Sequence, residues 1–150
     1  MHPDPPLLPS DPGDRAYVRS LAYDIACDLH PLNNLRVLRH LKKQMNASPE
    51  DIVQWQTHWL QEGLLNLEGR LLRHDNRAAG QFCFGSSPTL ADICLVPQVF
   101  NCLALASIPD FSKNFPILSR ISKNCLELKA FRDASWEQQA DSKGQRNPIL

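Results

Sequence analysis

The sequence predicts an all-α fold, and three observations carry that prediction. Apolar residues recur at three- and four-residue spacing through most of the 150-residue chain. Two segments open with a cap residue, a proline and acidic side chains, as helices do: Asp11-Pro12 and Ser48-Pro49-Glu50-Asp51. Only one short run, residues 80–84, suits an extended strand, and one strand cannot form a sheet. We therefore expect one helical domain over residues 13–138, between a proline-rich, linker-like segment at 1–12 and a polar tail at 139–150.

Composition places the chain among globular proteins and gives no charge-based indication of a partner. Apolar residues make up 43% of the chain, and the formal net charge is zero. A neutral chain has no bulk attraction for nucleic acid or an anionic membrane, so neither is expected as a partner. No apolar run approaches the ~20 residues of a membrane helix, and the N-terminus lacks a signal pattern. The odd number of cysteines, five, without a Cys-x-x-Cys pair indicates reduced thiols in a cytoplasmic protein.

The first two predicted helices form an antiparallel pair. Apolar residues recur at helical spacing over residues 13–45, although the proline in His30-Pro31 lacks a backbone donor and predicts a kink there. The second helix is expected over residues 48–73. Its apolar face consists of Ile52, Trp55, Trp59, Leu64, Leu67 and Leu71.

The third predicted helix, residues 89–105, has the most specific start signal. Thr89 is a favourable N-cap whose hydroxyl can accept from the backbone N–H three residues on, and Asp92 can reach back to the N–H of Thr89. The helix is apolar on most faces, so we expect it to be central and buried. A fourth helix is expected over 116–126 and a short one over 129–135. The segments 75–88 and 106–115 are expected to be loops.

Polar residues interrupt the first apolar stripe at the predicted kink. His30 and Asn34 are four residues apart, so both can project from one face of a helix. The adjacent Asn33 and Asn34 lower helix propensity, which favours a hydrogen-bonding role. One interpretation is a binding site; the other is that these side chains satisfy backbone groups freed by the kink. Arg36 points elsewhere on a straight helix and is either a ligand-binding or a solvated side chain.

Other reactive residue types lack the settings that catalysis needs. The histidines show no metal-ligand spacing such as His-Glu-x-x-His, so no metal is expected. Cys94 and Cys102 lie on an apolar helix without a nearby histidine, whereas a nucleophilic thiol needs an electropositive, accessible setting. No residue of the chain is therefore assigned a catalytic role.

Two segments of the chain carry a resemblance to one known family. The first runs from Phe84 to Gln98: an aromatic-glycine turn, the capping box, and then Asp-x-x-Leu-Val-Pro-Gln. The second is His30-Pro31-Leu32-Asn33-Asn34-Leu35-Arg36-Val37-Leu38. Together they resemble the C-terminal domain of zeta-class glutathione transferases, the maleylacetoacetate and maleylpyruvate isomerases. The resemblance covers nearly the whole chain.

This resemblance implies a function for the polar residues at the kink. In the family, the first helix of this domain faces a glutathione site in the cleft between two domains. His30, Asn34 and Arg36 match positions that contact glutathione, and Leu35 lies between them, so these four are the expected cofactor-binding residues. The implied activity is glutathione-dependent cis–trans isomerisation in aromatic amino acid catabolism. The implied partners are a thioredoxin-like domain, in cis or in trans, and a second copy in a homodimer.

Two departures from the family pattern limit what this chain is expected to do. We expect the N-terminal thioredoxin-like domain, which stabilises the glutathione thiolate, to be absent, because the sequence shows no βαβ pattern. Ala104 stands where family isomerases usually carry an arginine thought to hold a substrate carboxylate. The chain is therefore interpreted as the helical half of an isomerase, inactive alone. The alternatives are a non-catalytic interaction module and a truncated or split gene product.

Overall fold

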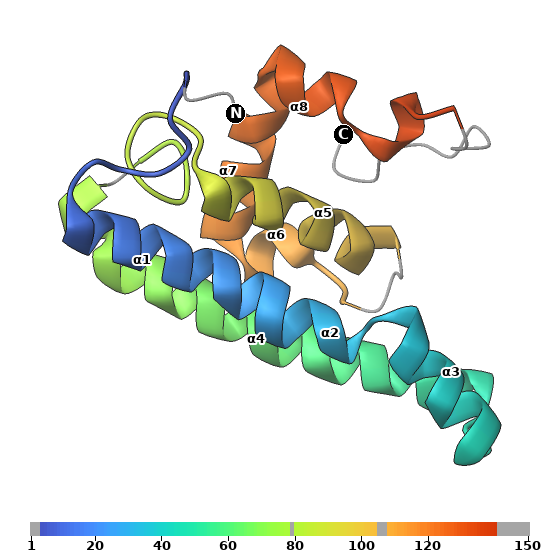
Figure 1. The fold of residues 1–150 in the computed structure, drawn as a ribbon. Coiled ribbons are helices and arrows are strands. Elements are labelled where there is room, and N and C mark those ends of the chain that lie inside the picture. The colour runs from blue at the N-terminus through green and yellow to red at the C-terminus, as the bar shows by residue number, and fades with distance from the viewer. Residues whose placement is uncertain (1–3, 79, 105–107, 141–150) are drawn as a thin grey trace.

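The computed structural model describes residues 4–78, 80–104 and 108–140, and the regular elements within these ranges are all helices (Figure 1). In chain order they are α1 (Pro12–Tyr23), the π-helix η1 (Asp24–Leu29), α2 (His30–Leu32), α3 (Leu35–Gln44), α4 (Pro49–Ala78), α5 (Leu90–Ala104), α6 (Phe111–Asn114), α7 (Pro116–Glu127), α8 (Lys129–Asp133) and the 3₁₀ helix η2 (Trp136–Gln138). The all-α prediction is confirmed.

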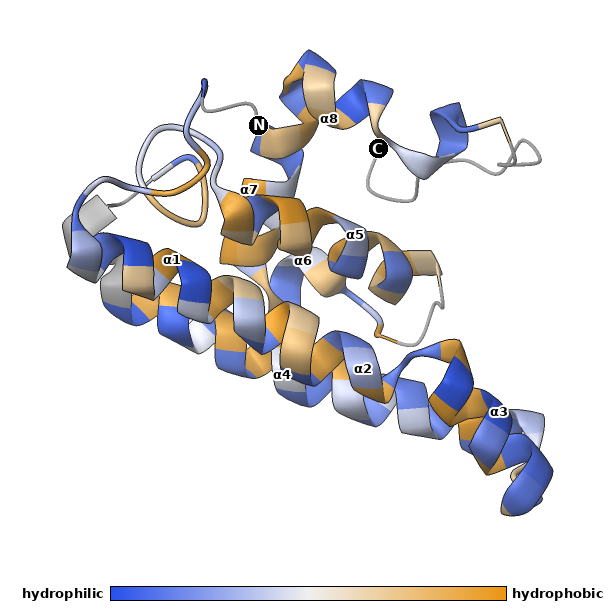
Figure 2. Cartoon of the chain, viewed as in Figure 1, coloured by the Kyte–Doolittle hydropathy of each residue, from blue (hydrophilic) through white to orange (hydrophobic). Residues whose placement is uncertain are grey.

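The helices form a bundle around α5. The α1–η1–α2–α3 segment runs alongside the long α4 as an antiparallel hairpin, and α5 packs between α1 and α7 (Figure 1). The first turns of α5 are predominantly hydrophobic (Figure 2). Leu21, Leu64, Leu95 and Leu118, from four different helices, have no exposed surface, and burying a leucine stabilises a fold by roughly 1.5–3 kcal/mol. The prediction of a central third helix is thus confirmed for its inner face.

The sequence signals place most helix boundaries correctly. At the start of α4, the Ser48 backbone N–H donates to Asp51 Oδ2 at 2.8 Å and the Asp51 N–H donates to Ser48 Oγ at 3.1 Å. These contacts, the backbone N–H first, lower the pKa of the Asp51 carboxyl. The helix continues to Ala78, beyond the predicted end, and α6 lies in the segment expected to be a loop. The predicted tail, apart from its first two residues, lies outside the described residues.

Asp92 is the polar centre of the bundle. Its side chain has no exposed surface, and its Oδ2 accepts from the Thr89 backbone N–H at 2.7 Å, as the capping-box prediction required. The Thr89 hydroxyl donates to the same oxygen at 2.9 Å. The Asp92 backbone N–H donates to the Thr89 carbonyl at 3.1 Å and not to the hydroxyl, so the prediction that this hydroxyl accepts from the N–H three residues on is wrong. The other oxygen, Oδ1, accepts from the Cys83 backbone N–H at 2.7 Å. Asp92 therefore ties the preceding loop to the start of α5.

The loop between α4 and α5 is held from a second side by α7. Arg120 donates to the Gly80 carbonyl at 2.6 Å, and Asn124 donates to the Gln81 carbonyl at 2.7 Å. Gly80 is required here because a Cβ would lie 2.1 Å from the Gly85 carbonyl oxygen. Side chains of α7 and the carboxylate of α5 together fix the path of this loop.

A carboxylate from α4 caps α7. The cap residue Phe115 has no side-chain oxygen to offer the first N–H groups of this helix. The side chain of Glu68, on α4, supplies the missing acceptors. Its Oε1 accepts from the Ile117 N–H at 2.8 Å and its Oε2 accepts from the Leu118 N–H at 2.9 Å. A long-range carboxylate thus satisfies the orphan donors and complements the positive end of the helix.

Replacement of Asp92 by alanine should destabilise the domain severely. The substitution leaves the Thr89 and Cys83 N–H groups and the Thr89 hydroxyl buried without an acceptor, at ~1–3 kcal/mol each. We expect a loss of about 3 kcal/mol or more in the free energy of unfolding, measured by urea denaturation. Asp51→Ala is the matched control, because water can reach that exposed box, and it should destabilise the domain much less than Asp92→Ala. Equal losses in the two variants would contradict the central role of Asp92.

Candidate functional site

The predicted kink takes the form of a π-helix ahead of Pro31 and a break behind it. In η1 the His30 N–H donates to the carbonyl of Ile25, five residues back. A π-helical turn widens the helix and often occurs at functional sites. Pro31 then occupies the first turn of α2, where its missing N–H costs least. The result is that His30 lies at a junction between two helix types, with an exposed side chain.

His30 reaches across to α5 and pairs with Gln98. The distance between His30 Nδ1 and Gln98 Nε2 is 2.7 Å. Gln98 is only 4% exposed, so its amide is held by the packing of α5. Sequence reasoning did not assign Gln98 to the site, although it closes the Val-Pro-Gln motif. A polar side chain on a largely apolar helix was the signal that could have identified it.

The adjacent asparagines break the helix. Asn34 has extended backbone angles and is the N-cap of α3, where its Oδ1 accepts from the Arg36 N–H at 3.1 Å. No continuous helix joins His30 to Asn34, so the argument that four-residue spacing puts them on one face is wrong. Both side-chain amide atoms of Asn33 are buried without a hydrogen-bond partner among the described residues. The Trp55 indole N–H donates to the Leu32 carbonyl at 2.8 Å and satisfies one backbone group at the break.

Leu35 and Arg36 form the first turn of α3, and both are exposed. Leu35 is 63% exposed, and the Arg36 side chain forms no hydrogen bond or ion pair with any residue that the structure describes. The structure therefore brings His30 together with Gln98, and Asn34 together with the backbone of Arg36. Within the part of the chain that the structure describes, no hydrogen bond joins His30 to Asn34 or to the Arg36 side chain.

One face of α5 is uncovered. Ile93, Pro97, Asn101 and Ala104 follow one another at spacings of four, four and three residues and are all exposed. Ile93 is 42% exposed, and Tyr23 at the end of α1 is 55% exposed. This face presents apolar side chains to solvent, and His30 contacts the same helix through the buried Gln98.

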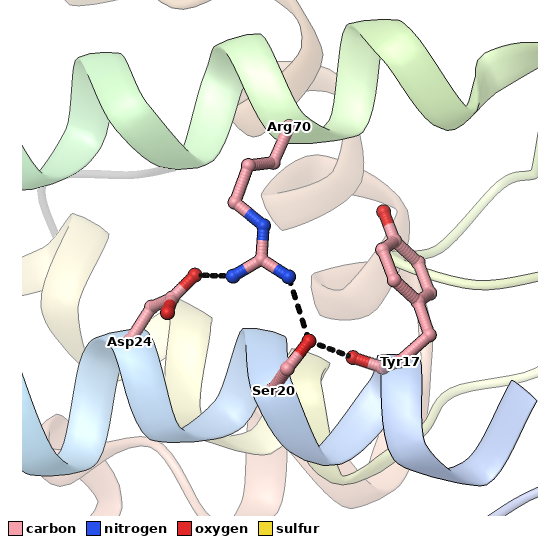
Figure 3. A network of polar contacts seen from close by, with 4 residues as sticks. All are labelled: Tyr17, Ser20, Asp24 and Arg70. Carbon is pink, nitrogen blue, oxygen red and sulfur yellow. Dashed lines mark hydrogen bonds and ion pairs between the residues drawn. The ribbon is translucent and has the colours of Figure 1, made fainter. Parts of the chain in front are cut away.

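A polar network fixes the start of the π-helix against α4 (Figure 3). Arg70 forms an ion pair with Asp24, the first residue of η1, and donates to Ser20 Oγ at 2.6 Å. The Ser20 hydroxyl in turn donates to the Tyr17 carbonyl at 2.7 Å. The Arg70 guanidinium carbon lies 5.9 Å from the centre of the Tyr17 ring, and burial raises the pKa of that phenol. One guanidinium therefore bridges α4 to both α1 and η1.

The buried cysteines are not poised for nucleophilic chemistry. Cys27, Cys83, Cys94, Cys102 and Cys125 are all free thiols. Burial raises the pKa of Cys102 to about 11, and burial followed by the Asp92 charge raises the pKa of Cys83 and Cys125. Among the described residues, no cluster of three His, Cys, Asp or Glu side chains is arranged to hold a metal ion. No helix in the described ranges has both the length and the apolarity to cross a bilayer.

Comparison with known proteins identifies this arrangement. No family model matches the chain. It is 40% identical over 141 residues to a probable maleylacetoacetate isomerase of Vibrio cholerae, covering 94% of this chain and 62% of the relative. It superposes on a glutathione S-transferase from Legionella pneumophila with a TM-score of 0.82 and 43% identity, covering 92% of this chain and 71% of that one.

Two further solved structures narrow the match. A bacterial maleyl pyruvate isomerase described as a zeta-class glutathione S-transferase gives a TM-score of 0.85 at 38% identity, over 93% of this chain and 63% of that one. A maleylacetoacetate isomerase from Anaeromyxobacter dehalogenans, solved with glutathione bound in its active site, gives a TM-score of 0.82 at 35% identity, over 94% of this chain and 61% of that one. This chain thus spans less than two thirds of the length of several of the proteins it matches.

The helical bundle around a capped central helix, with its polar junction at His30, is the helical domain of a glutathione transferase. More narrowly, the chain belongs to the zeta class of that family, the class of the maleylacetoacetate and maleylpyruvate isomerases.

Removal of the Arg70 guanidinium should test whether the network of Figure 3 holds α1 and η1 on α4. Arg70→Met keeps the aliphatic stem but leaves Asp24 and Ser20 without their donor, which should cost roughly 1–3 kcal/mol of unfolding free energy. Arg73→Met, on the exposed side of the same helix, is the control and should change stability by less than about 0.5 kcal/mol. Arg70→Lys should rescue the loss only in part, because Asp24 and Ser20 each contact a different nitrogen of the planar guanidinium, whereas lysine offers a single nitrogen. Full stability in Arg70→Met would show the network to be dispensable.

Proposed function

We propose that this chain is the helical part of a glutathione-dependent cis–trans isomerase acting on maleylacetoacetate or maleylpyruvate. The single observation that carries the proposal is the polar junction around His30, which contacts α5 through the buried Gln98. Family membership supports it, since relatives matching over more than nine tenths of this chain are described as maleylacetoacetate or maleylpyruvate isomerases.

In this proposal the chain binds and orients glutathione and does not perform the bond chemistry. When bound, glutathione supplies the thiolate that adds reversibly to the cis double bond. The exposed imidazole of His30 can donate to an oxygen of glutathione, and the amide N–H groups of Asn34 remain available because its Oδ1 is the helix cap. Arg36, exposed on the first turn of α3, can pair with a carboxylate.

The uncovered face of α5 would meet a thioredoxin-like domain, supplied in cis or in trans. Tyr23 and Ile93 are large apolar side chains that this contact would remove from water. In the family that domain supplies most of the glutathione site and stabilises its thiolate. The N-terminal segment lies close to this region of the bundle, since the Leu7 carbonyl accepts from the Leu90 N–H at 2.9 Å.

Ala104 favours a second candidate function, a non-catalytic interaction module. It is exposed on the same face as Pro97, seven residues away, at the position where family isomerases usually carry arginine. A methyl group cannot bind a carboxylate, so a dianionic substrate loses one partner here. The two functions differ in a direct assay: only the isomerase requires glutathione-dependent turnover after a thioredoxin-like domain is supplied.

A chain of these 150 residues should show no isomerase turnover by itself. The groups that stabilise the thiolate belong to the other domain in the family, and each such electrostatic group is worth ~10²–10³-fold in rate. The measurement is the absorbance change of maleylacetoacetate with glutathione. A protein that joins this chain to the thioredoxin-like domain of a zeta-class relative is the positive control. Turnover proportional to the concentration of the isolated chain would contradict the prediction.

Loss of the His30 or Asn34 donor should weaken glutathione binding by the joined two-domain protein. A hydrogen bond to a charged group is worth ~1.5–3 kcal/mol, so His30→Ala should reduce affinity about tenfold or more in titration calorimetry. Asn34→Ser is preferable to Asn34→Ala, because serine keeps an N-cap oxygen while removing the amide donor. Exposed His40 on α3 gives the matched control, His40→Ala. Unchanged affinity in both variants would leave His30 and Asn34 as groups that only complete the helix break.

A further inference from the structure

We propose that Gln98 is a positioning residue that holds His30 in one neutral tautomer, with the proton on Nε2. The inference concerns this chain's own geometry, and only its consequence for glutathione rests on the proposed function. The contact that carries it is the 2.7 Å approach of Gln98 Nε2 to His30 Nδ1.

The two partners differ in freedom, and this difference decides which one sets the geometry. Gln98 is 4% exposed and lies on α5 between Leu95 and Cys102, which are 0% and 1% exposed. Its side chain therefore has little room to move, and in this structure the amide nitrogen is the end that faces the ring. His30 is exposed and projects from the junction of η1 and α2. The buried amide is the fixed reference, and the imidazole orients against it.

The chemistry of the pair then determines the proton position. An amide nitrogen can only donate, and a neutral imidazole has one donor and one acceptor nitrogen. With the Gln98 NH₂ donating to Nδ1, the ring proton must be on Nε2. The imidazole nitrogen farther from the backbone is then a committed donor. His30 presents an N–H to its exposed side.

This assignment restricts what His30 can recognise. A committed N–H donor binds an acceptor oxygen, such as a carboxylate or a peptide carbonyl, and cannot accept from a ligand N–H or S–H. In the proposed function the ligand group opposite His30 is therefore a carboxylate or carbonyl oxygen of glutathione, not its thiol. If the Gln98 amide were oriented the other way, the His30 Nδ1–H would donate to the amide oxygen, and the conclusion would be reversed.

Nuclear magnetic resonance on the full chain separates the two orientations. In ¹⁵N-labelled protein we expect a scalar coupling across the hydrogen bond between Gln98 Nε2 and His30 Nδ1, and ring shifts of an Nε2–H tautomer. A protonated Nδ1 in the neutral ring, without that coupling, overturns the proposal. His30→Gln assigns the ring signals, because the chain has five histidines.

The variant Gln98→Glu tests the assignment more directly, because a carboxylate can only accept a hydrogen bond from the ring. We expect the neutral His30 ring of this variant to carry its proton on Nδ1, which leaves Nε2 without a proton to donate. Gln61→Glu makes the same chemical change on the exposed side of α4 and should leave the His30 signals unchanged. Gln98→Met keeps a side chain of similar length without the amide and should abolish the coupling with helicity retained. A His30 spectrum insensitive to both Gln98 variants overturns the proposal.

Glutathione affinity distinguishes this inference from the proposed function. In the two-domain protein, Gln98→Glu should weaken glutathione binding about tenfold or more, as expected for losing one donor to a charged group. If the spectra show the Nε2–H tautomer but wild-type protein does not bind glutathione, the proposed function fails while the assignment of the tautomer stands. If glutathione binds but the spectra show Nδ1–H, the assignment fails and the function stands.

Discussion

The rest of the structure depends on the buried carboxylate of Asp92. It accepts from the Thr89 N–H, the Thr89 hydroxyl and the Cys83 N–H, so three donors that water cannot reach are satisfied by one side chain. The Cys125 thiol lies 3.9 Å from the same carboxylate and brings α7 into contact with it. A neutral residue of the same size could not accept from all of these groups. The start of α5, the loop before it and the centre of α7 are therefore placed relative to one another by a single charge.

The site depends on a second constraint, the irregular stretch of the first long helix. Pro31 cannot continue a regular hydrogen-bond ladder, and the chain responds with π-helical turns before it and a break at Asn33 and Asn34 after it. Arg70 fixes the beginning of this stretch through Asp24, and Trp55 fixes its end through the Leu32 carbonyl. Side chains of α4 thus hold both ends of this segment, whose conformation the local sequence alone does not determine. A side chain at such a junction can be aimed independently of the helix on either side.

The sequence could predict features that depend on neighbours a few residues apart. The capping interaction of Asp92 with Thr89 lies within one turn, and the helix starts at Pro12 and Pro49 follow from local cap chemistry. The contact between His30 and Gln98 joins residues 68 positions apart. It depends on how α5 packs against η1, and no local sequence pattern predicts that packing. Asn34 shows the opposite failure: the spacing argument assumed a continuous helix, whereas α2 ends at Leu32 and Asn34 is the N-cap of the next helix, α3. The α6 helix was missed because four residues carry too little periodicity to predict a helix.

The two constraints meet on α5. Asp92 and Gln98 are six residues apart, about 9 Å along the axis at 1.5 Å per residue, with Pro97 between them. Asp92 sets where the helix begins, and the buried residues on its inner face set its rotation, so together they fix the height and direction from which the Gln98 amide meets His30. The orientation of the exposed His30 imidazole therefore depends on the buried Asp92 carboxylate, although the two groups are not in contact. A change at Asp92 that shifted α5 by a fraction of a turn would separate the Gln98 amide from the ring while leaving every residue of the polar junction in place. For this reason the junction and the anchor form one structural unit, and the binding chemistry assigned to His30 is a property of the packed bundle as well as of its local sequence.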